Sequence, residues 1–191
     1  IGLGFAGSVV ARQLADAGNE VIALERRAHI AGNMFEYERG NGVRVHLYGP
    51  HLFHTNLEPV YNFLSKFSSF YPYSHRVLGL IDKKLIPIPF NFTSIDTLFS
   101  EDIALRYKRK LLSNHKKNTR VFVSDLIDSG DQDIKSLGQY ILQKVFINYS
   151  AKQWGISLDQ LDASVINRVP VVIGDDDRYF SDTIQKMPIH G

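Results

Sequence analysis

The chain has no cysteine among its 191 residues, and only one tryptophan. Without thiols it can form neither disulfide bonds nor thiolate metal sites, which fits the reducing cytoplasm, where we expect this protein to work. It also lacks any apolar run of about 18 residues, so the sequence predicts no membrane-spanning helix. Its net charge of +2 is too small to indicate a nucleic-acid partner. The 44% of hydrophobic residues is enough for a folded core.

A glycine-rich turn opens the sequence, where Gly2, Gly4 and Gly7 follow the pattern Gly-x-Gly-x-x-Gly. Gly2 permits a tight turn, Gly4 lets a pyrophosphate approach the backbone, and Gly7 lets the following helix pack against a strand. Because this turn normally follows a buried strand, we expect such a strand upstream of Ile1. The pattern indicates a dinucleotide site, and the alternative is a glycine turn of purely structural use.

The residues after the turn complete a βαβ pattern. Val10 and Leu14 lie at helical spacing, and Gly18 is a suitable C-terminal cap. The apolar run over residues 20–25 predicts a second strand, which ends on Glu25. The helix N-terminus would bind the phosphates, and Glu25 would accept hydrogen bonds from ribose hydroxyls of an adenosine.

The residues after Glu25 favour FAD over NAD. A pair of small residues shortly after the acid, here Ala31-Gly32, is typical of FAD enzymes of the glutathione-reductase type, in which the chain passes close to the cofactor. Arg26 would lie near the adenosine ribose, or would be a solvated charge at the end of the strand.

The rest of the chain predicts helices and short strands. Helical spacing marks three regions, at residues 56–68, 94–120 and 137–145. The first is expected to begin with a capping box at Thr55–Glu58. Prolines break residues 79–93 into short pieces, and residues 166–191 are expected to form strand and loop.

The segment Tyr48–Thr55 resembles the Tyr-Gly-x-His-x-Phe-His-Thr signature of UDP-galactopyranose mutases. Further segments agree with that family in the same order, namely Glu25–Asn33, Ile88–Asn91, Tyr149–Gly155, Asn167–Pro170 and Tyr179–Asp182. The resemblance covers essentially the whole sequence and stops at Gly191, where the family continues for roughly as long again. We therefore expect the N-terminal half of such a protein.

The resemblance implies an α/β fold: an FAD-binding Rossmann-like domain of the glutathione-reductase type with an inserted, mostly helical substrate domain. The expected division is residues 1–75 for the FAD-binding part, 76–165 for the inserted domain, and 166–191 for a mobile loop and a strand returning toward the site. The family interconverts UDP-galactopyranose and UDP-galactofuranose, with N5 of reduced FAD attacking the anomeric carbon of UDP-galactose. Family members are commonly homodimers.

The motif and the resemblance together supply the candidate residues. The cofactor-binding set is Gly2, Gly4, Phe5, Gly7, Glu25, Arg26, Gly32, Asn33 and His51. The substrate-binding set is Asn91, Phe146, Tyr149, Trp154, Arg168 and Tyr179. Arg168, His54 and His51 are the catalytic candidates, with Arg168 expected to bind the diphosphate through its planar fork of donors. Outside the resemblance, an aromatic such as Phe146 is more often a core residue.

Three further features have ordinary interpretations. His51 and His54 lack additional ligands at suitable spacing, so no metal site is expected. The acidic run Asp175–Asp177 is expected to be a solvated loop, and the basic stretch 106–120 a solvated helical face rather than a nucleic-acid surface. Two alternative functions stay open: another FAD-dependent oxidoreductase of the same fold, which would not need the Trp154 motif, or an inactive nucleotide-binding fragment.

Overall fold

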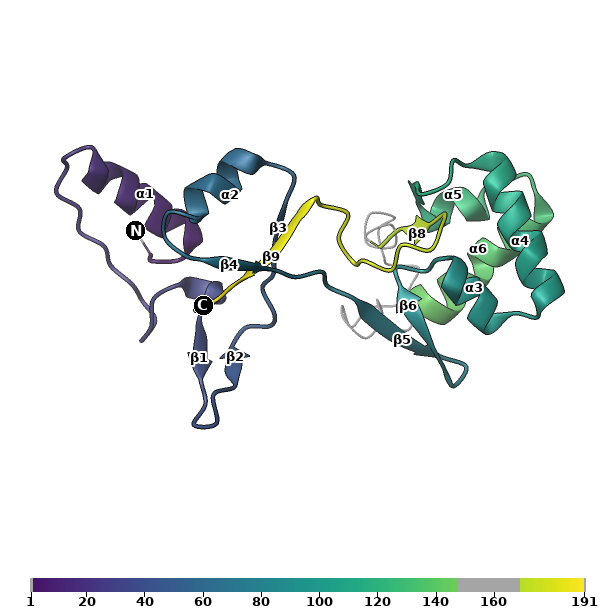
Figure 1. Cartoon of the computed structure of the whole chain (residues 1–191), viewed down its shortest axis with the longest axis horizontal. Coiled ribbons are helices and arrows are strands. Elements are labelled where there is room, and N and C mark those ends of the chain that lie inside the picture. The colour runs from purple at the N-terminus through teal and green to yellow at the C-terminus, as the bar shows by residue number, and fades with distance from the viewer. Residues whose placement is uncertain (1, 148–168, 191) are drawn as a thin grey trace. The chain divides into compact units, whose positions relative to one another are not determined.

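The computed structural model describes residues 2–147 and 169–190, which form two compact units (Figure 1). Unit 1 contains Ile1–Tyr73 and Asp182–Gly191, and unit 2 contains Ser74–Ser181. No helix within the described ranges is long and apolar enough to cross a membrane. The division expected at residues 75 and 165 stays a prediction, as does the role of the helical part as an inserted substrate domain.

Unit 1 combines two helices with short antiparallel strands. Its elements are α1 (Phe5–Asp16), η1 (Gly32–Met34), β1 (Glu36–Glu38), β2 (Arg44–His46), β3 (Phe53–Thr55), α2 (Glu58–Leu64), β4 (Phe70–Pro72) and β9 (Ile184–Pro188). β1 and β2 form a hairpin, whereas β9 lies between β3 and β4 and is antiparallel to both. The three-stranded sheet of unit 1 therefore has as its central strand a segment from the far end of the sequence (Figure 1).

Helix α1 ends as the glycine at position 18 predicts. Gly18 has a left-handed backbone with φ of +82°. Its N–H donates to the carbonyl of Ala15 at 3.0 Å, and the N–H of Asn19 donates to that of Leu14 at 3.0 Å. These two bonds form a Schellman motif, which satisfies carbonyls that the helix end would otherwise leave unpaired.

Two predictions for unit 1 are wrong. Residues 20–25 form no strand, because no other described segment pairs with them, and a strand needs a hydrogen-bonded neighbour. The capping box at Thr55 is also absent, since Thr55 belongs to β3 and pairs with Ile184. Its hydroxyl accepts instead from the N–H of Leu57 at 3.0 Å, and α2 begins only at Glu58.

Unit 2 consists of a hairpin, a helical bundle and a short pair of strands. Its elements are β5 (Val77–Ile81), β6 (Lys84–Ile88), α3 (Phe92–Leu98), α4 (Glu101–Asn114), β7 (Arg120–Val121), α5 (Val123–Ile127), α6 (Gln132–Ile141), the π-helical turn η2 (Leu142–Phe146) and β8 (Val171–Val172). The predicted helices around residues 94–120 and 137–145 are confirmed, although the first is divided into α3 and α4.

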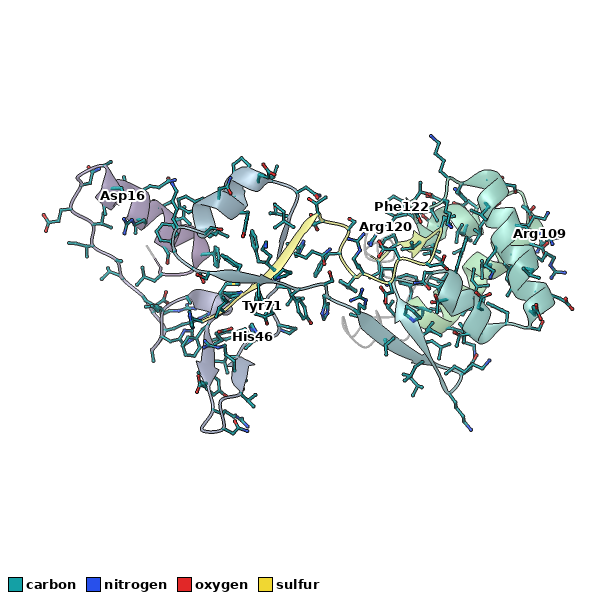
Figure 2. The ribbon with its side chains drawn as sticks, in the orientation of Figure 1. Asp16, His46, Tyr71, Arg109, Arg120 and Phe122 are labelled. Carbon is teal, nitrogen blue, oxygen red and sulfur yellow. The ribbon has the colours of Figure 1, made fainter. Side chains whose placement is uncertain are left out.

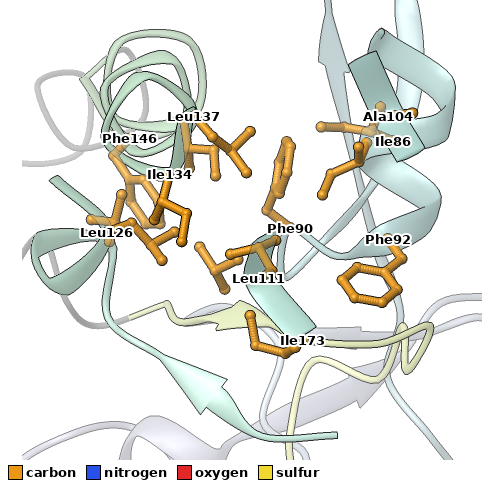
Figure 3. Close-up of a cluster of buried hydrophobic side chains, with 14 residues drawn as sticks. Ile86, Phe90, Phe92, Ala104, Leu111, Leu126, Ile134, Leu137, Phe146 and Ile173 are labelled. Carbon is orange, nitrogen blue, oxygen red and sulfur yellow. The ribbon is translucent and has the colours of Figure 1, made fainter. Parts of the chain in front are cut away.

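The hydrophobic core described by the structure lies in unit 2 (Figure 3). Side chains from β6, the residues after it, α4, α5, α6, η2 and the segment after β8 meet there, including Ile86, Phe90, Leu111, Leu126, Ile134, Leu137, Phe146 and Ile173. In unit 1 many apolar side chains stay exposed, with Ile22 at 76% and Leu24 at 71%. This contrast makes unit 2 the better packed of the two units.

Candidate functional site

The glycine turn and Glu25 are joined directly. One carboxylate oxygen of Glu25 accepts from the N–H of Leu3 at 2.7 Å, and the other from the N–H of Arg27 at 3.0 Å. These bonds, the one from Arg27 first, lower the pKa of Glu25 below its ordinary value and keep the side chain ionised. Each carboxylate oxygen has two lone pairs, so Glu25 can still accept hydrogen bonds from a ribose.

Further contacts join the glycine turn to the Ala31-Gly32 pair. The N–H of Ala31 donates to the carbonyl of Leu3 at 2.8 Å. Gly32 has φ of +59°, and a Cβ at this position would lie 3.0 Å from the Cα of Gly4. The backbone of Gly4 therefore leaves little room for a side chain at position 32, whereas a Cβ at Gly4 would lie an ordinary 3.9 Å from the Cα of Gly32. Ala31 itself adopts φ of +71°, a left-handed conformation that favours glycine.

Helix α1 offers its N-terminus to an anion. Gly4 is the N-cap, no side chain caps the helix, and its first turn contains no acidic residue. The first-turn N–H groups and the helix dipole can therefore hold a pyrophosphate beside the turn. A pocket of about 370 Å³ adjoins this turn, lined by Gly4, Phe5, Ser8, Val9, Arg12, Ala31, Phe63, Leu64 and Phe67. Asn33 and Arg26 are exposed nearby in sequence. These residues fit a bound dinucleotide.

Buried polar atoms in unit 1 also lack partners. The Nδ1 of His51 and the Nη1 of Arg27 have no hydrogen-bond partner among residues 2–147 and 169–190. The Arg27 guanidinium lies 4.6 Å from the ring centroid of Tyr48, a cation–π contact. Buried polar atoms without partners are uncommon and are often satisfied by a ligand or water. Arg27 was not among the residues predicted from sequence, although it lies two positions after Glu25.

His54 is paired with an aspartate from the other end of the chain. Its Nδ1 lies 2.8 Å from a carboxylate oxygen of Asp182, whose second oxygen accepts from Asn56 at 3.0 Å. Asn56 in turn accepts from the N–H of Thr183 at 2.9 Å. This network orients the imidazole of His54, and it depends on the pairing of β3 with β9.

Tyr179 lies in unit 2, at the end of a segment that we call the Tyr179 loop (residues 174–180). The acidic run in this loop is held by arginines rather than simply solvated. Asp176 pairs with Arg178 at 2.7 Å and Asp177 pairs with Arg76 at 2.8 Å. The hydrogen bond from Arg178 lowers the pKa of Asp176 to about 2. The basic stretch is likewise partly paired, through the bonds Arg106–Asp133, Lys108–Asp96 and Lys110–Asp131.

Asn91 and Phe146 occupy interior positions. Asn91 is fully buried and caps α3, with its side-chain oxygen accepting from the N–H of Ser94 at 3.0 Å and its amide donating to the carbonyl of Asp176 at 3.3 Å. Phe146 is 4% exposed and packs in the core of unit 2. Both residues support the fold, and their contact with a substrate stays a prediction. Tyr149, Trp154 and Arg168 lie outside the described residues.

Comparisons with known proteins agree with the motifs. The family model described as UDP-galactopyranose mutase matches residues 144–191, and the model described as NAD(P)-binding Rossmann-like domain matches residues 1–67. A probable UDP-galactopyranose mutase of Klebsiella pneumoniae is 34% identical over 189 residues, 98% of this chain and 48% of the relative. The UDP-galactopyranose mutase of Mycoplasma genitalium is 35% identical over 198 residues, covering 100% of this chain and 48% of the relative.

A relative with a different name matches equally well. The dTDP-fucopyranose mutase of Escherichia coli is 34% identical over 192 residues, 100% of this chain and 50% of the relative. The chain thus spans about half the length of the curated relatives it matches. The matches confirm the resemblance and a Rossmann-like, dinucleotide-binding part at the start of the chain.

Proposed function

We propose that this chain, as a relative of the UDP-galactopyranose mutases, carries the FAD site and part of the substrate site of an enzyme that interconverts UDP-galactopyranose and UDP-galactofuranose. The observation that carries the proposal is the glycine turn. It is joined to Glu25 and packed against Gly32, in a chain whose residues 144–191 match the mutase family. Reduced FAD, when bound, would supply the nucleophilic chemistry at the anomeric carbon of the sugar.

The residues of unit 1 would hold the cofactor. The N-terminus of α1 and the N–H groups after Gly4 would bind the pyrophosphate, since this helix end carries partial positive charge and no capping side chain. Glu25 would bind the adenosine ribose through its remaining lone pairs. His51, with a buried nitrogen that has no partner among the described residues, would donate to or accept from a polar atom of the flavin. His54, oriented by Asp182, would hold a proton near the reacting groups.

The substrate would be bound by three residues within the range 148–168, which the structure leaves undescribed, and by Tyr179. Tyr149 and Trp154 would contact the uridine, while Arg168 and Tyr179 would bind the diphosphate through charge-assisted hydrogen bonds. Neutralising the diphosphate favours its departure as a leaving group, and closing the site around it excludes water from the reacting sugar.

The cofactor is tested by the visible absorption spectrum of the complete purified protein. Flavin bands that disappear on Gly32→Ala but persist on Gly42→Ala would support the FAD site, because only the first substitution crowds Gly4. A colourless protein that fails to take up added FAD, yet binds NAD, would overturn this part of the proposal in favour of another dinucleotide enzyme.

The reaction is tested by turnover of UDP-galactofuranose by the dithionite-reduced protein. The same assay with the corresponding dTDP-fucose isomers decides the substrate class, because the Escherichia coli relative carries that name. Arg168→Ala and Trp154→Ala are expected to weaken UDP binding, with Arg109→Ala, an exposed arginine on α4 (Figure 2), as the control. Unchanged UDP affinity in both variants would show that the substrate residues are wrongly assigned.

A further inference from the structure

We infer that Arg120 is a positioning residue for Tyr179: its guanidinium fixes the backbone that presents the tyrosine to the substrate diphosphate. The inference rests on the proposed function, which places Tyr179 at that diphosphate. Arg120 begins β7, where it pairs with Val172 of β8. From there Arg120, labelled in Figure 2, donates from its Nη1 to the carbonyl of Tyr179 at 3.2 Å and from its Nη2 to the carbonyl of Arg178 at 2.9 Å.

The start of the Tyr179 loop is anchored in the core of unit 2. Val172 and Ile173 are buried, and the N–H of Val172 donates to the carbonyl of Phe90 at 2.8 Å. The N–H of Ile173 donates to the carbonyl of Thr119 at 2.9 Å, and the carbonyl of Gly174 accepts from Phe92 at 2.9 Å. The loop therefore leaves a rigid segment, and the direction in which it continues depends on the bonds made further along.

The other end of the loop is held beside the hairpin. The N–H of Tyr179 donates to the carbonyl of His75 at 2.8 Å, and Arg178 forms an antiparallel bridge with Arg76. Together with the bond from Arg120, this leaves both backbone polar groups of Tyr179 bonded. The Cα of Tyr179 is thus held from two sides, by His75 and by Arg120, and the direction of its side chain follows from that backbone.

Three arginines surround this loop, and their partners decide which role they have. Arg76 makes two bonds to the carboxylate of Asp177, at 2.8 and 2.9 Å. Arg178 makes two to Asp176, at 2.9 and 2.7 Å. A diphosphate would have to break an existing ion pair to bind either of them. Arg120 donates to two successive carbonyl oxygens, which are atoms of the loop itself, so its planar fork suits holding the loop.

The test is a double-mutant cycle on UDP affinity, measured by calorimetry on the complete protein. Tyr179→Phe is expected to weaken UDP binding about tenfold, by removing a hydrogen bond to a charged group. Arg120→Met is expected to weaken it about five- to tenfold by releasing the loop, with Arg109→Met as a control that leaves affinity unchanged. Because Arg120 acts through Tyr179, the double variant is expected to bind about as weakly as Tyr179→Phe alone.

The outcomes separate the inference from the proposed function. If the unmodified protein does not bind UDP, both are overturned. If UDP binds and the losses from Arg120→Met and Tyr179→Phe multiply in the double variant, or if Arg120→Met binds normally, the inference alone is overturned. If Tyr179→Phe binds normally, the assignment of Tyr179 to the diphosphate is overturned together with the inference. If Arg120→Met does not fold, Arg120→Lys replaces it in the same cycle. Lysine keeps the charge but cannot donate to both carbonyls at once, so Arg120→Lys is expected to weaken UDP binding about threefold. In the Tyr179→Phe background, the same substitution is expected to have no further effect on UDP affinity.

Discussion

Replacing Gly32 by alanine tests whether the close approach of residues 4 and 32 holds the nucleotide site together. Gly32 has φ of +59°, and the added Cβ would lie 3.0 Å from the Cα of Gly4. The atom it meets is backbone, which cannot rotate aside as the end of a flexible side chain could. The glycine turn is also bonded to Glu25 through Leu3 and to Ala31. Any movement of Gly4 away from Gly32 would therefore strain those bonds.

Gly42 provides a matched control for the size of this effect. It also has a left-handed backbone, with φ of +78°, but no atom lies within 4 Å of the position of an added Cβ. A left-handed alanine costs about 1–2 kcal/mol, which a stiffer unfolded chain offsets by about 0.4–1 kcal/mol. Gly42→Ala should therefore lower the free energy of unfolding by about 1 kcal/mol or less. Gly32→Ala adds overcrowding of about 1–3 kcal/mol, so its expected loss is about 1–4 kcal/mol.

Urea unfolding of the complete protein measures both losses, and the flavin absorbance per mole of protein measures cofactor retention. We expect Gly42→Ala to keep the cofactor and Gly32→Ala to lose most of it, because the crowding falls on the turn that would bind the pyrophosphate. Equal losses of stability in the two variants would refute the reasoning. So would a Gly32→Ala protein that is as yellow as the unmodified one.

Three further predictions concern unit 2. Gly138→Ala should lower the free energy of unfolding by about 1–2 kcal/mol in urea titrations, because its Cβ would lie 2.9 Å from the backbone nitrogen of Ile127. This loss is expected although alanine has the better helix propensity. Gly130→Ala, with open space around the added Cβ, is the control and should be nearly neutral. The pKa of Asp176 is lowered to about 2, so its ionised form stabilises the fold above about pH 4, and that stabilisation is lost as pH falls toward 2. In acid unfolding, the stability of Asp176→Asn should therefore lack the pH dependence that Asp176 contributes. Burial and a hydrogen bond to Asp82 raise the pKa of Tyr140 to about 12, so the fold loses stability between about pH 10 and 12, and the tyrosinate absorbance of Tyr140→Phe should lack the last ionisation.

The local features of the site were predictable from the sequence because their signals are local. The glycine spacing and the acid at position 25 identified a turn that the structure joins to Glu25 by a single hydrogen bond. Gly18 ended a helix as expected, because a left-handed residue after the last turn is a property of the chain itself.

Features that depend on pairing were predicted less well. Residues 20–25 have the composition of a strand, yet composition cannot supply a neighbour, and none of the described segments pairs with them. Thr55 has the spacing of a helix cap, but it lies in β3 and pairs with β9, which is more than a hundred residues further along the chain. A strand partner that is so distant leaves no trace in the residues around Thr55.

The contacts of charged residues around the Tyr179 loop were also not predictable from the sequence, because the partners are distant along the chain. A sequence motif transferred from a family indicates a side chain expected to touch the ligand, here Tyr179, and contains no information on what holds its backbone. Arg76 and Asp177, or Arg120 and the carbonyl of Tyr179, are distant in sequence, and each charge taken alone is best interpreted as solvated, because most charged residues are. Only the paired strands β7 and β8 bring Arg120 to the loop. The residues that position a ligand contact are therefore those for which a structure adds most to a motif.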